Sequence, residues 1–303
     1  MRPGAKKSLL SALAFTASLG GMVDTASAAT GRLIVTGGAT QVEGSAGGGI
    51  VPLAFITGLG SRDEIGGVAF LSNDSLDDHD IRVGGFGIGL YDRVELTFSH
   101  INVIADDSLA GQVLGNTNVE TQVFGVKVKV AGDAMYAPDE WLPQIAVGVQ
   151  YKHNLDEKLM DQLGVDDDGW DFYVAATKVY HGALFGRNIF LNGVLRATKA
   201  NQIGAFGFGN NNASDDDDDE YKLVVEASAG VLLTRKFLVG AEYRQKPDNE
   251  LLGGAVNEDD WWTAFAAWFP NKHVALVAAY TNFGTIGLND DQDGLYTSIQ
   301  VTF

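Results

Sequence analysis

From residue 65 to the last residue, apolar and polar side chains alternate within successive short segments. Phe124, Val126 and Val128 share one side of such a segment if it is extended, because side chains alternate with a period of two along a strand. Lys127 and Lys129 fall on the opposite side. The pattern predicts antiparallel strands with one apolar face. The expected strands are 65–73, 80–91, 93–104, 121–131, 143–154, 169–181, 188–200, 221–235, 236–247, 259–270, 272–284 and 293–303.

The connections between these strands decide how the apolar face is buried. A soluble sandwich turns that face inward, whereas a membrane barrel turns it toward lipid. Tight turns are expected at 91–93, 234–236 and 270–272, with the connectors 132–142 and 182–187 at the same end. Longer acidic loops alternate with them, at 73–80, 105–120, 155–168, 201–220, 247–258 and 285–292. We therefore predict an all-β fold, a transmembrane antiparallel β-barrel of about 12 strands, or alternatively 14, with extracellular acidic loops.

The final strand carries a further barrel feature. Leu295, Ile299, Val301 and Phe303 share one face, and the chain stops on the aromatic Phe303. A terminal amphipathic strand that ends in phenylalanine resembles the signal by which outer-membrane barrels are recognised and inserted. We therefore expect Phe303 to be a membrane-assembly signal, with the barrel-assembly machinery and outer-membrane lipid as partners.

The N-terminal residues have the pattern of an export signal. Arg2, Lys6 and Lys7 form a basic region, and residues 8–23 are mostly apolar. The small residues of 26–28 then provide a cleavage site. Residues 1–28 are therefore predicted to be a signal peptide, and the bacterial outer membrane is the predicted location. The apolar run is shorter than the ~20 residues of a membrane-spanning helix.

Between this signal and the first expected strand lies a glycine-rich segment, residues 29–64. Its glycines permit backbone conformations that other residues avoid, so the segment is able to fold against a wall. It is interpreted either as a plug inside the barrel or as two further strands. The segment also has the glycines of a phosphate-binding loop, but no Lys-Ser or Lys-Thr pair follows at the required spacing.

Three stretches carry a resemblance to a known family: 37–52 (GGATQVEGSAGGGIVP), 89–96 (GLYDRVEL) and 271–280 (NKHVALVAAY). They resemble motifs of a proteobacterial outer-membrane family catalogued as domain of unknown function 3034, and the resemblance spans the chain beyond the signal. It implies an outer-membrane barrel. It implies no particular activity and no catalytic residues.

The polar faces of the expected strands carry charges of both signs. A barrel places these side chains in its lumen, where they would line a pore and set its selectivity. They would equally close the lumen by pairing with one another. We therefore expect a channel or transporter for small solutes, with a non-conducting structural or surface-interaction barrel as the alternative. The predicted lumen-lining residues are Arg93, Glu95, Lys127, Lys129, Lys152, Arg196, Glu226, Glu242 and Arg244.

One expected loop carries six consecutive carboxylates. Hard oxygen ligands at this density suit Ca²⁺ or Mg²⁺, although a solvated, self-repelling loop is the simpler explanation of the run. The candidate ligands for a loosely bound cation, which would bridge lipopolysaccharide phosphates, are Asp215, Asp216, Asp217, Asp218, Asp219 and Glu220. No other cofactor is expected.

Catalysis and nucleic-acid binding are not expected. The five histidines are scattered and lack the sequence contexts of a hydrolase. The net charge of −18 repels phosphate backbones, and no basic patch interleaved with aromatic residues is present in the sequence. The sequence therefore predicts a protein that is not an enzyme.

Overall fold

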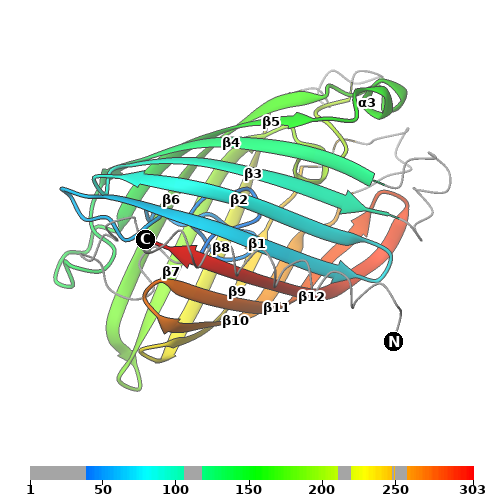
Figure 1. Cartoon of the computed structure of the whole chain (residues 1–303). Coiled ribbons are helices and arrows are strands. Elements are labelled where there is room, and N and C mark those ends of the chain that lie inside the picture. Colours follow the sequence, from blue (N-terminus) through cyan, green and yellow to red (C-terminus); the bar gives the residue numbers. More distant parts are fainter. Residues whose placement is uncertain (1–38, 106–117, 211–219, 248, 250–257) are drawn as a thin grey trace.

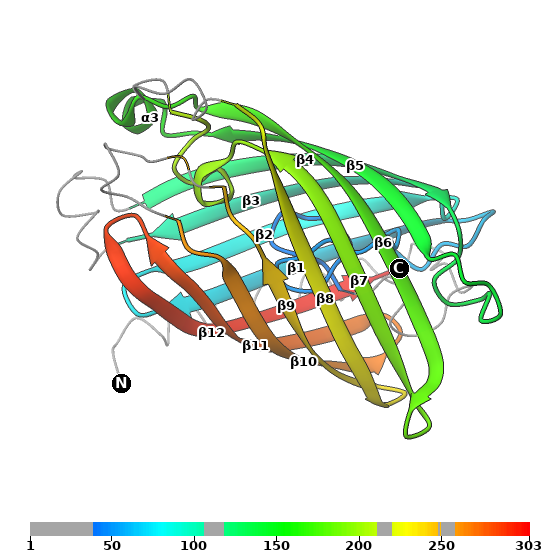
Figure 2. The same cartoon turned by 180° about the vertical axis from the view of Figure 1, so that it is seen from behind.

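The computed structural model describes residues 39–105, 118–210, 220–247, 249 and 258–303. They form one closed antiparallel barrel, in which each strand pairs with its sequence neighbours and β1 pairs with β12 (Figures 1 and 2). The strands are β1 (Ile65–Leu76), β2 (Asp80–Leu90), β3 (Val94–Ile104), β4 (Asn118–Ala131), β5 (Gln144–Asn154), β6 (Asp168–Leu184), β7 (Arg187–Thr198), β8 (Lys222–Thr234), β9 (Phe237–Arg244), β10 (Trp261–Asn271), β11 (Val274–Ile286) and β12 (Asn289–Thr302).

The predicted fold class and the expectation of 12 strands are confirmed, and the alternative of 14 strands is wrong. The reason lies in the closure of the barrel. β1 pairs directly with β12, from Val68 opposite Thr302 to Leu76 opposite Gly294, so no further strand fits between them. The predicted signal peptide, residues 1–28, lies outside the described residues.

The outer face of the barrel is apolar. Side chains along a strand alternate between the lumen and the outside. In β10, for example, Trp262 and Trp268 are exposed, whereas Thr263, Phe265 and Ala267 between them are buried. The exposed outer face includes Phe86, Ile88, Leu96, Phe124, Val126, Val147, Phe172, Val174, Leu191, Leu195, Leu223, Val225 and Leu295. A closed barrel with an apolar outer band crosses a bilayer without leaving strand edges unpaired.

The two ends of the barrel differ in their connections. The turn end, on the left in Figure 1 beside the C-terminus, has the connectors 91–93, 132–143, 185–186, 235–236 and 272–273. The loop end has the connectors 77–79, 105–117, 155–167, 199–221, 245–260 and 287–288. The expected long loops at 73–80 and 285–292 are therefore short turns. Strand pairing continues through these polar residues, because backbone hydrogen bonds in a ladder do not require apolar side chains.

Two short helices lie in loop-end connectors. α3 (Glu157–Leu163) precedes β6 and buries Leu159, Met160 and Leu163, while η1 (Asn201–Gly204) follows β7. Among the described residues, no helix is long and apolar enough to cross a membrane.

The aromatic residue at the C-terminus packs at the barrel seam. The N–H of Phe303 donates to the carbonyl of Gly67 at 2.8 Å, and the N–H of Gly67 donates back to Phe303 at 2.6 Å. A Cβ added to Gly67 would lie 2.6 Å from a ring atom of Phe303. The ring therefore lies directly on the glycine, and β1 and β12 are joined to the last residue of the chain.

Candidate solute pathway through the barrel

Residues 39–64, here called the lumen segment, enter the barrel, where Figure 1 shows their blue ribbon behind the strands, and only Arg62 and Asp63, just before β1, are exposed. Within 40–60, every residue except Gly48 and Phe55 is buried. Its own regular structure is limited to isolated bridges, Thr40 with Ala46 and Gly47 with Pro52. The lumen segment thus occupies the barrel interior as an irregular chain and adds no strand to the wall.

Inward-facing carboxylates of the wall hold the main chain of the lumen segment. Glu242 on β9 accepts hydrogen bonds through Oε2 from the N–H groups of Gly49, at 2.6 Å, and Ile50, at 2.9 Å. A Cβ on the preceding Gly48 would lie 1.9 Å from Glu242 Oε1. A larger residue at position 48 would therefore require the Glu242 carboxylate to move.

A second contact forms on the opposite wall, at β3 and β4. Glu95 and Lys127 are both 1% exposed and their charged atoms lie 3.0 Å apart. Glu95 accepts hydrogen bonds from the Ser45 hydroxyl at 2.8 Å and from the Thr57 N–H at 2.7 Å. Lys127 Nζ donates to the Leu53 carbonyl at 3.0 Å. This wall pair is therefore tied to three separated points of the lumen segment.

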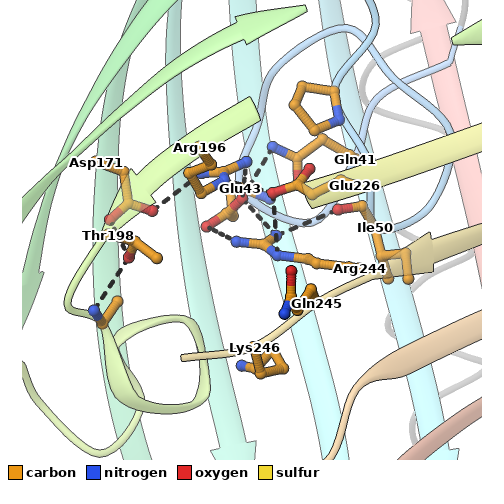
Figure 3. Close-up of polar contacts among 12 residues, drawn as sticks. Gln41, Glu43, Ile50, Asp171, Arg196, Thr198, Glu226, Arg244, Gln245 and Lys246 are labelled. Atoms are coloured by element: carbon orange, nitrogen blue, oxygen red, sulfur yellow. Dashed lines mark hydrogen bonds and ion pairs between the residues drawn. The ribbon is translucent and has the colours of Figure 1, made fainter. Parts of the chain in front are cut away.

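Glu43 is the central charged residue of the lumen segment, and it points into a cluster of buried ionic side chains (Figure 3). Its carboxylate lies 2.7 Å from Arg244 on β9 and 3.4 Å from Arg196 on β7, and it also pairs with Lys152 on β5. Three strands that are separated around the wall thus converge on one carboxylate.

The wall contributes two further carboxylates to the same cluster. Asp171 on β6 lies 2.7 Å from Lys152 and 3.0 Å from Arg196, and Glu226 on β8 pairs with Arg196. Three cations are therefore balanced by two wall carboxylates and Glu43. Without Glu43, the wall would hold one uncompensated positive charge in a buried position, which is energetically costly.

These neighbours also determine the ionisation of Glu43. Burial raises the pKa of its carboxyl, but Arg244, Lys152 and Arg196 outweigh this effect and hold the pKa well below its usual range. Glu43 is therefore a carboxylate at neutral pH, and its charge is part of what binds the lumen segment to the wall.

Neutral side chains complete the contacts with the wall. Gln144 on β5 donates to the Ala54 carbonyl at 2.6 Å, and the Ala54 N–H donates to Thr177 Oγ1 on β6 at 2.8 Å. On the far side, the Thr40 hydroxyl donates to Gln300 on β12 at 3.1 Å. The lumen segment is thus anchored across the full width of the barrel.

The connector 199–210 narrows the pathway nearer the loop end. Asn154 Nδ2 donates to the carbonyls of Gly204 and Ala205, both at 3.0 Å, and Phe208 exchanges backbone hydrogen bonds with Asp166. Phe208 is fully buried. The prediction of an acidic loop at 201–220 is therefore wrong for the first part of this stretch, which folds inward. The available signal was the apolar run 203–208, which precedes the acidic residues.

The structure brings together most of the residues expected in the lumen. Eight side chains are buried in the interior: Glu95, Lys127, Lys129, Lys152, Arg196, Glu226, Glu242 and Arg244. Arg93 is different. It lies in the turn before β3, its side chain is exposed, and it donates to the Lys129 carbonyl at 3.1 Å. β3 begins at Val94, so Arg93 lies outside the strand and does not take part in its alternation between lumen and exterior. Arg93 is thus not a lumen residue.

Two central residues of the cluster were not anticipated. Asp171 follows the period-two pattern between the exposed Trp170 and Phe172, so the alternation itself was a usable signal. Glu43 lies in an irregular segment with no periodicity, and its role depends on residues far away in sequence.

Of the aromatic residues near strand ends, Trp261, Phe269 and Tyr296 also face inward and are buried.

The proposed cation ligands Asp215–Asp219 lie outside the described residues, and the sixth, Glu220, is exposed. Elsewhere at the loop end, His153, Glu157 and Asp167 have ligand atoms within 4.8 Å of one another. His153 and Asp167 are partly exposed and their ionisable atoms lie 3.9 Å apart. This group belongs to the surface of the loop end and is not connected to the charged cluster in the lumen.

The closed barrel with an apolar exterior and a charged interior defines the class of this protein: it is a bacterial outer-membrane β-barrel. The sequence profile of a family described as "Protein of unknown function (DUF3034)" matches residues 36–300, and the chain belongs to that family. A search of curated protein sequences gave no match.

Several solved barrels are similar in structure. Omp33 of Acinetobacter baumannii is 12% identical, with a TM-score of 0.42, over 80% of this chain and 100% of that one. The NanC porin is 8% identical, with a TM-score of 0.46, over 78% and 98%. The COG4313 outer membrane channel from Pseudomonas putida F1 is 12% identical, with a TM-score of 0.46, over 84% and 97%.

Proposed function

We propose that the protein is an outer-membrane channel for small solutes whose lumen is closed by its own lumen segment. The observation that supports this function is the charged cluster around Glu43, in which strands β5, β7 and β9 hold one carboxylate of the lumen segment. Such contacts are reversible, because water and mobile ions replace them once the segment leaves.

The hydrogen-bonded ladder of the wall closes without a strand from the lumen segment. The barrel closes through the β1–β12 ladder, and the segment contributes no strand to it. Its displacement would expose a polar and charged middle section, containing Lys127, Lys152 and Arg196 together with Glu95 and Glu226. Charges of both signs in a lumen are suited to the passage of small polar solutes.

A reversible cross-link tests whether movement of the lumen segment controls conduction. The chain has no cysteine, so the pair Ala54→Cys and Thr177→Cys introduces the only two thiols. The Ala54 N–H lies 2.8 Å from Thr177 Oγ1, so the segment touches the wall at this point. We expect openings in planar bilayers under reducing conditions and their loss after oxidation, with Thr177→Cys alone unaffected by oxidation.

The alternative is a barrel that does not conduct and serves as a structural or surface-interaction protein. It is favoured by the pairing of the buried charges with one another. Lys152 and Arg196 are both fully buried, and both pair with Asp171 of the wall. Absence of openings from the reduced, folded protein would support this alternative. Openings that persist after verified disulfide formation would exclude the lumen segment as the gate.

A further inference from the structure

A cavity lies between the lumen segment and the wall at the turn end. Its wall is made of inward-facing side chains of β6 to β11, among them Val179, Phe190, Leu238, Phe265, Phe269 and Val277. Ala46, Gly47 and Leu53 of the lumen segment cover it on the side that faces the barrel centre. The empty volume is about 680 Å³, including the space where the cavity opens to solvent.

The lining of this cavity is apolar throughout. Its lining residues are Ala, Gly, Val, Leu, Phe and Met only, and not one of them carries a polar side chain. This differs from the charged middle of the same lumen, and from the polar interiors by which barrels pass hydrated solutes. Water needs two to four polar partners to occupy a cavity stably, so a lining of this kind favours an apolar occupant.

The cavity has a route to the surface at the turn end. Phe55, Met135 and Leu232 line it and remain partly exposed. Met135 belongs to the connector 132–143, and Leu232 lies close to the end of β8, so both mark the turn end of the barrel. A small molecule would reach the cavity from this end without displacing the charged contacts of Glu43.

We infer that this cavity is a binding site for a small apolar molecule, of the size of a single aromatic ring or a short aliphatic chain. The rings of Phe190, Phe265 and Phe269 line the cavity and provide dispersion contacts for such a ligand. Binding to this cavity does not depend on conduction. Only the idea that the bound molecule is also transported rests on the proposed channel function.

The test uses fluorobenzene as the probe and the whole protein in lipid nanodiscs. Binding is measured by fluorine NMR, with empty nanodiscs to subtract partitioning into lipid. Ala267 lies in the cavity wall on β10, so Ala267→Met extends a side chain into the cavity. Ala264 is on the outer face of the same strand and is exposed, so Ala264→Met is the matched control.

We expect saturable binding by the wild type, a loss of affinity of about tenfold or more in Ala267→Met, and unchanged affinity in Ala264→Met. Heat-modifiable migration in gels establishes that each variant is folded. Crystals pressurised with xenon should show the gas beside Phe265 in the wild type and not in Ala267→Met.

Absence of saturable binding in the wild type would overturn the assignment, as would equal binding by Ala267→Met. Binding that appears only after deletion of residues 29–38 would also overturn it, since the occupant would then be the chain itself. Failure of the proposed channel would be distinguishable, because binding would persist in a protein that does not conduct.

Discussion

Neutralising Glu43 should release the lumen segment. Glu43→Gln keeps the shape of the side chain but leaves Lys152, Arg196 and Arg244 with only Asp171 and Glu226 as buried counter-charges. Removing one partner of a buried ionic cluster costs about 3–5 kcal/mol. The glutamine amide retains part of the hydrogen bonding, so we take the lower end, about 3 kcal/mol, as the loss in the free energy of docking. This loss corresponds to a roughly hundredfold shift of the equilibrium toward the released state.

Single-channel recording in planar bilayers measures this shift as the fraction of time spent open. The matched control is Glu140→Gln, because Glu140 is an exposed glutamate in the connector 132–143 and lies outside the cluster. The double variant Glu43→Gln with Lys152→Met leaves two cations facing two carboxylates, and should restore much of the closure. An open fraction of Glu43→Gln equal to that of the wild type would refute the assignment of Glu43 as the principal charged contact.

The remaining predictions concern pH, the barrel seam, the wall and the acidic loop. Because the pKa of Glu43 is lowered in the docked state, the difference in closure between the wild type and Glu43→Gln should be constant above about pH 4.5 and should shrink as the pH falls further. Gly67→Ala would press on the ring of Phe303 and should lower the heat-modifiable fraction, as should deletion of Phe303, whereas Gly193→Ala, in open space, should be tolerated. Glu242→Gln replaces the carboxyl group that accepts from the N–H groups of Gly49 and Ile50 by an amide with one acceptor oxygen, and should raise the open fraction about tenfold, again measured in bilayers. Calorimetric titration with Ca²⁺ should show heat at millimolar concentration that disappears when 215–220 are replaced by serine; no heat would remove cation binding by this loop.

Much of the barrel could be read from the chain. The alternation of Phe124, Val126 and Val128 with Lys127 and Lys129 assigns each side chain to one of two faces, because the period of a strand is two. Lengths of turns and loops then indicate which strand ends lie together. Strand boundaries were less certain, since pairing extends through polar residues at the loop end and stops before Arg93 at the turn end.

The contents of the lumen could not be read in the same way. Lys152, Arg196 and Arg244 were recognisable as inward-facing, but their common partner Glu43 lies more than a hundred residues away in a segment without periodicity. The inward fold of 199–210 and the apolar cavity likewise combine residues from many strands.

Local alternation and turn lengths therefore determined, from sequence alone, that the chain forms a barrel with an apolar exterior. Only the tertiary structure decided that residues 39–60 lie inside it as a segment rather than in its wall. The physical reason is that the face of the sheet on which a residue lies depends on its neighbours along the same strand. Docking of the lumen segment depends instead on the charge balance between Glu43 and side chains that closure of the barrel brings together.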